Sequence, residues 1–357
     1  MNYKPLLTVL LTTLLFVSPS LAGDKCTCLS LAGGGDKGAY QAGALQRLVE
    51  LEGDKVDYDI VAGVAVGALN TAWVGLYERS KISDMVNNLV NAWLDISKQL
   101  IYKSWFGGIA QGVLFEKGIY NNAPVFDFVD KTLADHPVQR KLSIGAVDAN
   151  SGSFLTFNYT KGPQPELIKF EAAASTCMPF VFPYALYEDM ALIDGGSVFS
   201  NNVVSCINLC AEEGYAEEDM IVDILMSSSN ANVENEEALG FTSLQHALRW
   251  LSISSYYNGN RDLTDAITAH PQVNFRHLVA PSKKLPSGML PLDFNSRDIK
   301  TMIELGRKDA ETVVSLPEGE MLKIWLDIYQ RKEAGELLDV PTEIERLSSE
   351  RLAQLKK

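Results

Sequence analysis

Basic residues are scarce in this sequence relative to acidic ones. Its 357 residues include 31 lysines and arginines against 45 aspartates and glutamates, which gives a formal net charge of −14 at pH 7. Nucleic acid is excluded as a partner, because binding to a phosphate backbone depends on lysine and arginine. Adsorption to an anionic membrane through charge alone is disfavoured for the same reason, so any contact with lipid is expected to be apolar.

Histidines and phosphate-binding loops are scarce as well. The four histidines lie in no nucleophile or metal motif, and no glycine-rich G-K-S/T loop occurs. We therefore expect no Ser-His-Asp triad, no metal site and no cofactor. His277 shares one face of an expected strand over residues 273–279 with Val273, Phe275 and Val279, which predicts a hydrogen-bonded core histidine.

Long apolar runs are missing except at the N-terminus, where residues 6–17 form one of about 12 residues. This run is too short to span ~30 Å of hydrocarbon. Together with Lys4 and with Ser20 and Ala22 it predicts a signal peptide over residues 1–22, cleaved before Gly23, with an uncleaved anchor as the alternative. A secreted or lumenal protein follows, in which the sequon at Asn158 could be glycosylated.

Five cysteines permit at most two disulfide bonds and leave one thiol free. Cys26 and Cys28 alternate on an expected strand and so share a face, while Cys206 and Cys210 lie one turn apart on an expected helix. The pairing stays open.

Strands and helices alternate along a chain that is 46% hydrophobic, which predicts an α/β fold with a mainly parallel sheet and helices on both faces. A long helical pattern covers residues 235–257, and a charged helical tail begins at Met321. After Pro341, Thr342 and Glu345 predict a capping box for the last helix.

Residues 63–67 read Gly63-Val64-Ala65-Val66-Gly67. An apolar strand over residues 59–62 precedes them and helical spacing of Val66, Leu69 and Trp73 follows, as in a G-x-S-x-G nucleophile elbow. Alanine, however, stands at the nucleophile position. Taken alone, the pattern also fits an ordinary strand-to-helix packing turn.

Two further motifs accompany this turn. Gly33-Gly34-Gly35-Asp36-Lys37-Gly38 follows a strand over residues 26–32, and its backbone amides suit an oxyanion or a phosphate. The same glycines satisfy G-x-G-x-x-G, but the acidic residue that a dinucleotide site needs after the second strand is replaced by the Gly63 elbow. Asp194-Gly195-Gly196 places a carboxylate at the end of an apolar segment, or forms a simple Asp-Gly turn.

In this order and spacing the three motifs resemble the patatin-like phospholipases, a family of lipid acyl hydrolases. Further similar segments are residues 118–124, 172–183, 292–294 and 302–306, so the resemblance covers about residues 26–315. It implies a patatin-like three-layer α/β fold with a mainly parallel central sheet and helices on both faces. We expect a phospholipase domain over residues 23–315 and a helical extension over 316–357.

The resemblance also implies roles for individual residues. In this family a serine and an aspartate form a catalytic dyad without histidine. Asp194 is then the proton acceptor, Ala65 occupies the nucleophile position, and the glycine loop with the Val66 amide forms the oxyanion hole. Within that loop, Gly34 and Gly35 are the expected donors. Lys37 stands where the family usually has arginine, and Val203 replaces a common proline. The Asp194 carboxylate is expected within about 5 Å of the Ala65 methyl group.

A methyl group cannot attack a carbonyl, so the acyl-enzyme route is closed in this sequence. We expect an acyl hydrolase of phospholipids or other acyl lipids that is inactive or nearly so, or alternatively a secreted lipid-binding pseudoenzyme. The alanine is either natural or engineered: the intact remaining motifs favour engineering or a recent loss, and the targeting peptide in the sequence favours a natural alanine. Residues 105–109 and 178–183 are expected to pack in the core beside the elbow, with peripheral membrane contact as the alternative. Lipid head group, acyl position and oligomeric state stay open.

Overall fold

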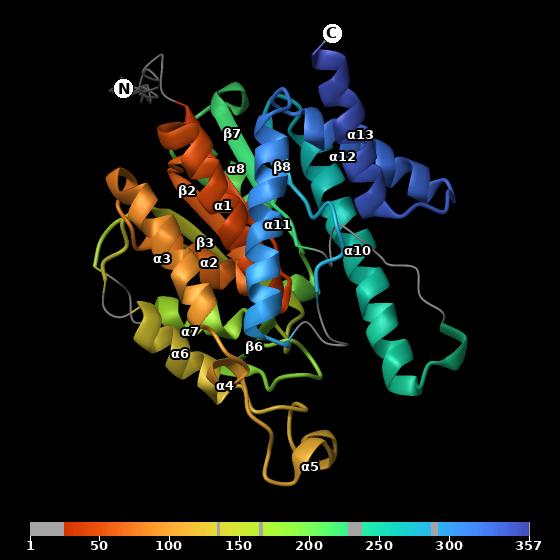
Figure 1. Ribbon diagram of the computed structural model, residues 1–357. Helices are drawn as coiled ribbons and strands as arrows, with labels where there is room; N and C mark the ends of the chain where they lie inside the picture. The colour runs from red at the N-terminus through yellow and green to blue at the C-terminus, as the bar shows by residue number, and fades with distance from the viewer. Residues whose placement is uncertain (1–24, 134–135, 164–166, 228–237, 287–291, 357) are drawn as a thin grey trace, which may run out of the picture.

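The computed structural model describes residues 25–133, 136–163, 167–227, 238–286 and 292–356. They form three layers, a central sheet with helices on both of its faces, as the α/β prediction expected (Figure 1). The signal peptide predicted over residues 1–22 lies outside the described residues. Within the described part of the chain, no helix has both the length and the apolar character needed to cross a bilayer.

Strands that are neighbours in the series β5-β6-β3-β2-β1-β7-β8 are hydrogen-bonded to each other, and β4 pairs with β3 as well. Neighbouring strands among β3, β2, β1, β7 and β8 run parallel, whereas β4 and β6 run antiparallel to β3, and β5 antiparallel to β6. Their bounds are β1 Cys26–Leu31, β2 Ile60–Val64, β3 Lys141–Asp148, β4 Ser153–Tyr159, β5 Ala185–Tyr187, β6 Met190–Asp194, β7 Met220–Leu225 and β8 Asn274–Val279.

Helices α1, α3 and α11 cover one face of the sheet, and α8 packs on β1, β2 and β7 from the other (Figure 1). The helices are α1 Gly38–Glu52, α2 Val66–Gly75, α3 Ile82–Asp95, α4 Lys98–Ile101, α5 Gly108–Phe115, α6 Ala123–Leu133, α7 Leu167–Ala174, α8 Val203–Glu212, α10 Ser243–Ala269, α11 Ser296–Val314, α12 Glu320–Glu333 and α13 Val340–Leu355.

Two glycines let α1 and α11 touch backbone to backbone. A Cβ on Gly43 would lie 2.1 Å from the carbonyl oxygen of Ile303, and one on Gly306 would lie 2.1 Å from that of Tyr40. The Tyr40 hydroxyl then donates to Asp309 at 2.9 Å. Since β1 runs through the glycine loop into α1, this contact fixes the helix that follows the loop.

Two disulfides join β1 to α8: Cys26 pairs with Cys210, and Cys28 pairs with Cys206. The strand and helix periodicities put both cysteines of each element on the facing sides, so the bonds lie one above the other. Cys177 is the free cysteine, and it is buried. The bonds therefore connect the strand before the glycine loop to the helix that follows Asp194.

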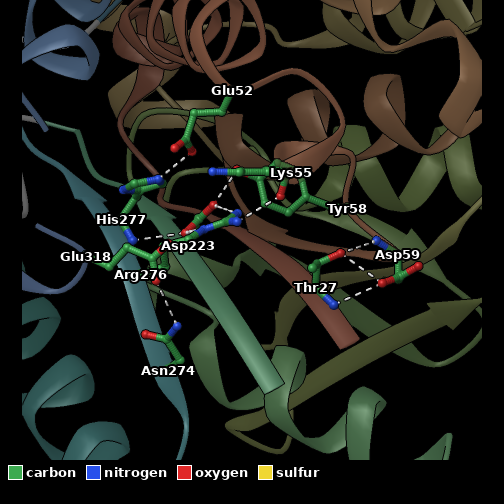
Figure 2. A network of polar contacts seen from close by, with 10 residues as sticks. All are labelled: Thr27, Glu52, Lys55, Tyr58, Asp59, Asp223, Asn274, Arg276, His277 and Glu318. Carbon is green, nitrogen blue, oxygen red and sulfur yellow. Dashed lines mark hydrogen bonds and ion pairs between the residues drawn. The ribbon is translucent and has the colours of Figure 1, made fainter. Parts of the chain in front are cut away.

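A buried ionic network joins β7 and β8 (Figure 2). The carboxylate of Asp223 accepts hydrogen bonds from Arg276 at 3.1 and 2.5 Å, from the Tyr58 hydroxyl at 2.7 Å and from the His277 amide at 2.9 Å. The His277 ring contacts Glu52 at 2.6 Å, which confirms the prediction of a hydrogen-bonded core histidine. The pairing of β7 with β8 shifts register at this point, because the His277 amide donates to the Asp223 side chain instead of to a backbone carbonyl of β7.

Some predicted boundaries are confirmed and others are wrong. The strands expected over residues 26–32 and 273–279 are present as β1 and β8. The last helix begins at Val340 rather than at a Thr342 cap, because Asp339 accepts the Thr342 amide at 3.2 Å and Pro341 falls in the first turn. The long helix α10 starts at Ser243 behind a capping box of Thr242 and Gln245 and runs to Ala269, well beyond the predicted end at residue 257.

Candidate functional site

The turn at residue 65 has the backbone geometry of a nucleophile elbow. β2 ends at Val64, Ala65 adopts φ 51° and ψ −127°, and α2 begins at Val66. A positive φ is rare for any residue with a Cβ and stores strain. The Ala65 carbonyl accepts the first helical bond, from the Ala68 amide at 2.9 Å. Residue 65 is therefore held on a tight bend between strand and helix.

Glycine is required on both sides of this bend because the chain passes so close to itself. A Cβ on Gly63 would lie 2.4 Å from the carbonyl oxygen of Gly67. A Cβ on Gly67 would lie 2.1 Å from that of Leu31, at the end of β1. No side chain fits at such distances, so these two positions are specified by the turn itself.

Ser175 anchors the elbow from the α7 side. Its hydroxyl accepts the Ala65 amide at 2.8 Å and donates to the Gly145 carbonyl of β3 at 2.5 Å. The side chain is fully buried. The sequence analysis did not single out this residue, since a serine after three alanines carries no pattern of its own.

Strand register brings Asp194 to the elbow. β4 occupies one edge of β3 over residues 142–148, so β2 and β6 share the other edge. On that edge Val64 pairs with Gly145, and Asp194 pairs with the next residue, Ala146. Because β2 and β6 run in opposite directions, their carboxyl ends meet head to head. Residue 65 and Asp194 thus each stand at the end of a strand, beside one another.

Gly195 and Gly196 complete this junction. A Cβ on Gly195 would lie 2.3 Å from the Gly145 carbonyl oxygen and 3.0 Å from Val64, so only glycine fits between the two strands. The Gly196 amide donates to the Asp194 carboxylate at 2.7 Å. The Asp194 backbone amide in turn donates to the Cys177 carbonyl at 3.0 Å.

Asp194 is poised between its protonation states. Burial raises its pKa to about 7, against the smaller opposing effect of the hydrogen bond from Gly196. The thiol of Cys177 responds to the same surroundings, since burial and the negative charge of Asp194 raise its pKa to about 12. A carboxylate with a pKa near neutrality is suited to proton transfer.

The glycine loop lies directly against residue 65. A Cβ on Gly33 would lie 3.1 Å from the Ala65 Cβ, and one on Gly38 would lie 2.5 Å from the Val66 side chain and 2.4 Å from Trp93. Ser227 supports the loop from beneath, because its hydroxyl donates to the Gly33 carbonyl and lies where a Cβ on Gly34 would be. Loop, elbow and Asp194 therefore converge at the carboxyl ends of β1, β2 and β6.

The individual groups of the loop have different partners. The Gly33 amide donates to the Ser200 carbonyl at 3.2 Å, so this amide already has an acceptor within the protein. Gly35 adopts φ 64°, and the Lys37 amide donates to the Gly34 carbonyl at 3.3 Å. Within the described residues, the amides of Gly34 and Gly35 have no protein acceptor.

The Asp36 side chain, predicted among the oxyanion-hole residues, holds a neighbouring turn. It is buried and accepts the Asp293 amide at 3.0 Å, and burial raises its pKa to about 6 despite the nearby charge of Lys37. The next residue in that turn, Phe294, has φ 43°. Asp36 thus fixes the loop to the segment before α11.

Asp262 of α10 supports the loop from the other side, and the sequence analysis missed it too. Its carboxylate accepts the Ser200 amide at 3.0 Å, while the Ser200 carbonyl accepts the Gly33 amide. Burial raises the pKa of Asp262 to about 7. Because α10 is so distant in sequence from Gly33, no local pattern could indicate this contact.

An apolar hollow of about 40 Å³ opens elsewhere, between α2, α3 and α6. It is lined by Leu69, Trp73, Trp93 and Phe128 among others, but by neither Ala65 nor Asp194. The hollow is therefore separate from the residues that the motifs single out.

Comparison with known proteins finds a family match over the residues that form the site. The family model described as patatin-like phospholipase matches residues 29–205, which include the glycine loop, the elbow and Asp194. No curated protein matches the chain. Among solved structures, VipD from Legionella pneumophila is similar with 10% identity and a TM-score of 0.36, over 90% of this chain and 79% of that one. The type III effector protein ExoU is similar with 14% identity and a TM-score of 0.26, over 93% and 63% of the two chains.

Proposed function

Because residues 29–205 belong to the patatin-like phospholipase family, we propose that this site is built to hydrolyse fatty-acyl esters of lipids with a Ser-Asp dyad. The nucleophile position of that dyad, residue 65, is alanine in this chain. The observation that carries the proposal is the strand junction on β3, where Val64 and Asp194 pair with consecutive residues. It brings the end of the elbow strand and a carboxylate of raised pKa to one point.

The proposed reaction follows from the groups gathered there when serine occupies residue 65. The serine oxygen attacks the acyl carbonyl carbon while Asp194 accepts the hydroxyl proton, and the amides of Gly34, Gly35 and Val66 stabilise the oxyanion. Asp194 then returns the proton to the departing alcohol of the lipid. Water attacks the acyl-enzyme by the same route, which releases the fatty acid and regenerates the serine.

The present chain cannot form the acyl-enzyme, because the Ala65 methyl group has no lone pair. In a serine hydrolase of another fold, loss of the catalytic residues leaves ~10³- to 10⁴-fold acceleration over water. We expect at most this much here. The alternative function, lipid binding without catalysis, is favoured by Ala65 itself, while the intact elbow, loop and Asp194 junction favour an otherwise complete hydrolase site.

Export to the secretory pathway or the cell exterior is part of the proposal. The predicted leader at residues 1–22 supports it, and so do the two disulfides, because such bonds persist in oxidising compartments. N-terminal sequencing of the native protein is expected to begin at or near Gly23. An intact Met1 would contradict this.

The experiment that tests the proposed function is Ala65→Ser. The added hydroxyl enters an elbow already bent for it, so a folding cost of about 1 kcal/mol or less is expected. The variant is expected to hydrolyse short-chain p-nitrophenyl esters and phospholipids, with the parent chain as the matched control. Turnover no faster than the parent on every ester of the panel would leave lipid binding as the function.

A further inference from the structure

Helix α5 exposes its apolar side chains to solvent, whereas an ordinary surface helix buries them. Its large apolar side chains, Ile109, Val113, Leu114 and Phe115, are exposed, and Leu114 and Phe115 keep 70% and 81% of their surface. The side that faces the protein carries Gly112, which is buried. Figure 1 shows α5 standing away from the body at the bottom of the view. Packing within the described part of the chain therefore does not explain why α5 carries these large apolar residues.

The helix is nevertheless held in place by specific contacts. A Cβ on Gly112 would lie 2.3 Å from the Ile119 carbonyl oxygen, so helix and chain touch there. The Trp105 indole donates to the Gly118 carbonyl at 3.0 Å. Gln111 donates to Glu116 at 2.7 Å and accepts the Gly107 amide at 2.8 Å. These bonds fix the orientation in which the apolar side chains point outward.

Phe180 adds a second exposed aromatic from a separate segment. Its side chain is 53% exposed. Its backbone has φ 71°, a conformation that bulky residues avoid. Its carbonyl accepts the Ile119 amide at 3.0 Å, which ties it to the base of α5. With the fully exposed Phe106, these residues form what we name the apolar tip: Phe106, Ile109, Val113, Leu114, Phe115 and Phe180. The prediction that residues 105–109 and 178–183 pack in the core is wrong for Phe106, Ile109 and Phe180.

Charge indicates what covers the apolar tip. Residues 104–115 contain no charged residue, in a chain of which 21% is charged. The exposed Lys103 precedes this stretch; it is followed by Glu116, which accepts the hydrogen bond from Gln111, and then by the exposed Lys117, although the chain as a whole carries a net charge of −14. An uncharged apolar stretch matches the acyl region of a phospholipid surface, and the exposed lysines on either side of it match the phosphates.

The apolar tip is also continuous with the site. From Phe180 the chain leads back to Met178, whose carbonyl accepts the Phe182 amide at 2.9 Å, and to Cys177, whose carbonyl accepts the Asp194 amide at 3.0 Å. A surface that docks at Phe180 thus lies within a few residues of the proposed proton acceptor.

We propose that the apolar tip inserts into the surface of a phospholipid bilayer and presents lipid to the site. This rests on the proposed function. Zwitterionic lipid is the expected partner, because the acidic chain is repelled by an anionic surface. Each large side chain moved out of water contributes about a tenfold factor to partitioning.

The test is flotation of the full chain with vesicles of phosphatidylcholine. The variant Phe106→Ser/Leu114→Ser/Phe115→Ser changes no charge and is expected to lower the partition coefficient about 100-fold or more. The control variant Leu337→Ser/Leu355→Ser removes two other exposed leucines, one just before α13 and one at its last residue. Figure 1 shows α13 at the opposite end of the molecule from α5. It is expected to float like the parent. Circular dichroism and thermal melting establish that each variant is folded.

Two results would overturn the inference: a folded triple variant that floats as well as the parent, or a parent that does not float. A dimeric parent that becomes monomeric in the triple variant would show that a second copy covers the apolar tip instead. A soluble short-chain ester separates this test from the proposed function. Added to Ala65→Ser, the triple change is expected to leave its hydrolysis unchanged. If Ala65→Ser is inactive while flotation still depends on the apolar tip, the proposed function is contradicted but membrane binding by the apolar tip is not.

Discussion

Two carboxylates near the central sheet, Asp223 and Asp194, differ in how their charge is compensated. Asp223 is fully buried and meets Arg276 with both oxygens, besides the Tyr58 hydroxyl and the His277 amide (Figure 2). Asp194 is half-buried, and among the described residues its carboxylate accepts one bond, from the Gly196 amide. A paired carboxylate holds strands together. One left uncompensated keeps a raised pKa and remains free to exchange a proton.

The largest expected effect is on ester turnover, when Asp194 can no longer accept and return a proton. In the Ala65→Ser background, Asp194→Asn removes the proposed proton acceptor while keeping the side-chain shape, so turnover should fall by about 10³-fold or more. Ester hydrolysis measures this. The free energy of unfolding at neutral pH should not fall, because no buried charge loses a partner. A folded double variant that turns over like Ala65→Ser would remove Asp194 from the dyad.

The converse change is Asp223→Ala, which leaves the Arg276 guanidinium buried without its partner. Breaking a buried ion pair in this way costs about 3–5 kcal/mol, so urea denaturation should show a large loss of stability. Asp59→Ala is the control from the same region. Asp59 accepts bonds from Thr27 but its side chain is 32% exposed, so a loss of about 1 kcal/mol or less is expected. Equal losses for the two variants would contradict the comparison.

The pH dependence of stability sharpens the contrast further. With a folded pKa of about 7, Asp194 binds a proton more tightly in the native chain than in the unfolded one. Its contribution to stability is therefore lost as pH rises from about 4 through 7. Asp194→Asn should exceed the parent by on the order of 2 kcal/mol at pH 8 and match it near pH 4, as urea titrations at both pH values would show. Activity of Ala65→Ser should rise over the same range.

The smallest effect is expected at Ser175, which is fully buried and bonded to the elbow. Ser175→Ala leaves the Ala65 amide without its acceptor, at a cost of about 1–2 kcal/mol. In the Ala65→Ser background it should lower kcat about tenfold and leave KM unchanged, since the elbow loosens while the binding surface persists. Thr176→Ala, which removes a hydroxyl bonded to the Ala173 carbonyl, is the control. A change in KM alone would argue against a positioning role.

Local patterns predicted the elements that carry the site. Strand β1, the glycine loop, the elbow and the strand before Asp194 each show in a short stretch of sequence, because their geometry depends on glycine and on apolar alternation. The cap of α13 was misjudged because two polar residues three positions apart, Asp339 and Thr342, could each begin the helix. The end of α10 was missed because its weakly periodic sequence depends on tertiary packing.

By itself the sequence predicted the α/β fold, indicated the resemblance to the patatin-like phospholipases and singled out Ala65, Asp194 and Gly33 to Gly38 as motif positions. The tertiary structure decided what joins them: the disulfide partners on α8, the Ser175 bond to the elbow, the Asp262 bond to Ser200, and the outward face of α5. Each of these contacts links residues far apart in the chain or depends on what the neighbouring elements leave uncovered. Periodicity describes one element at a time, so it says which face is apolar but not which partner, if any, covers that face.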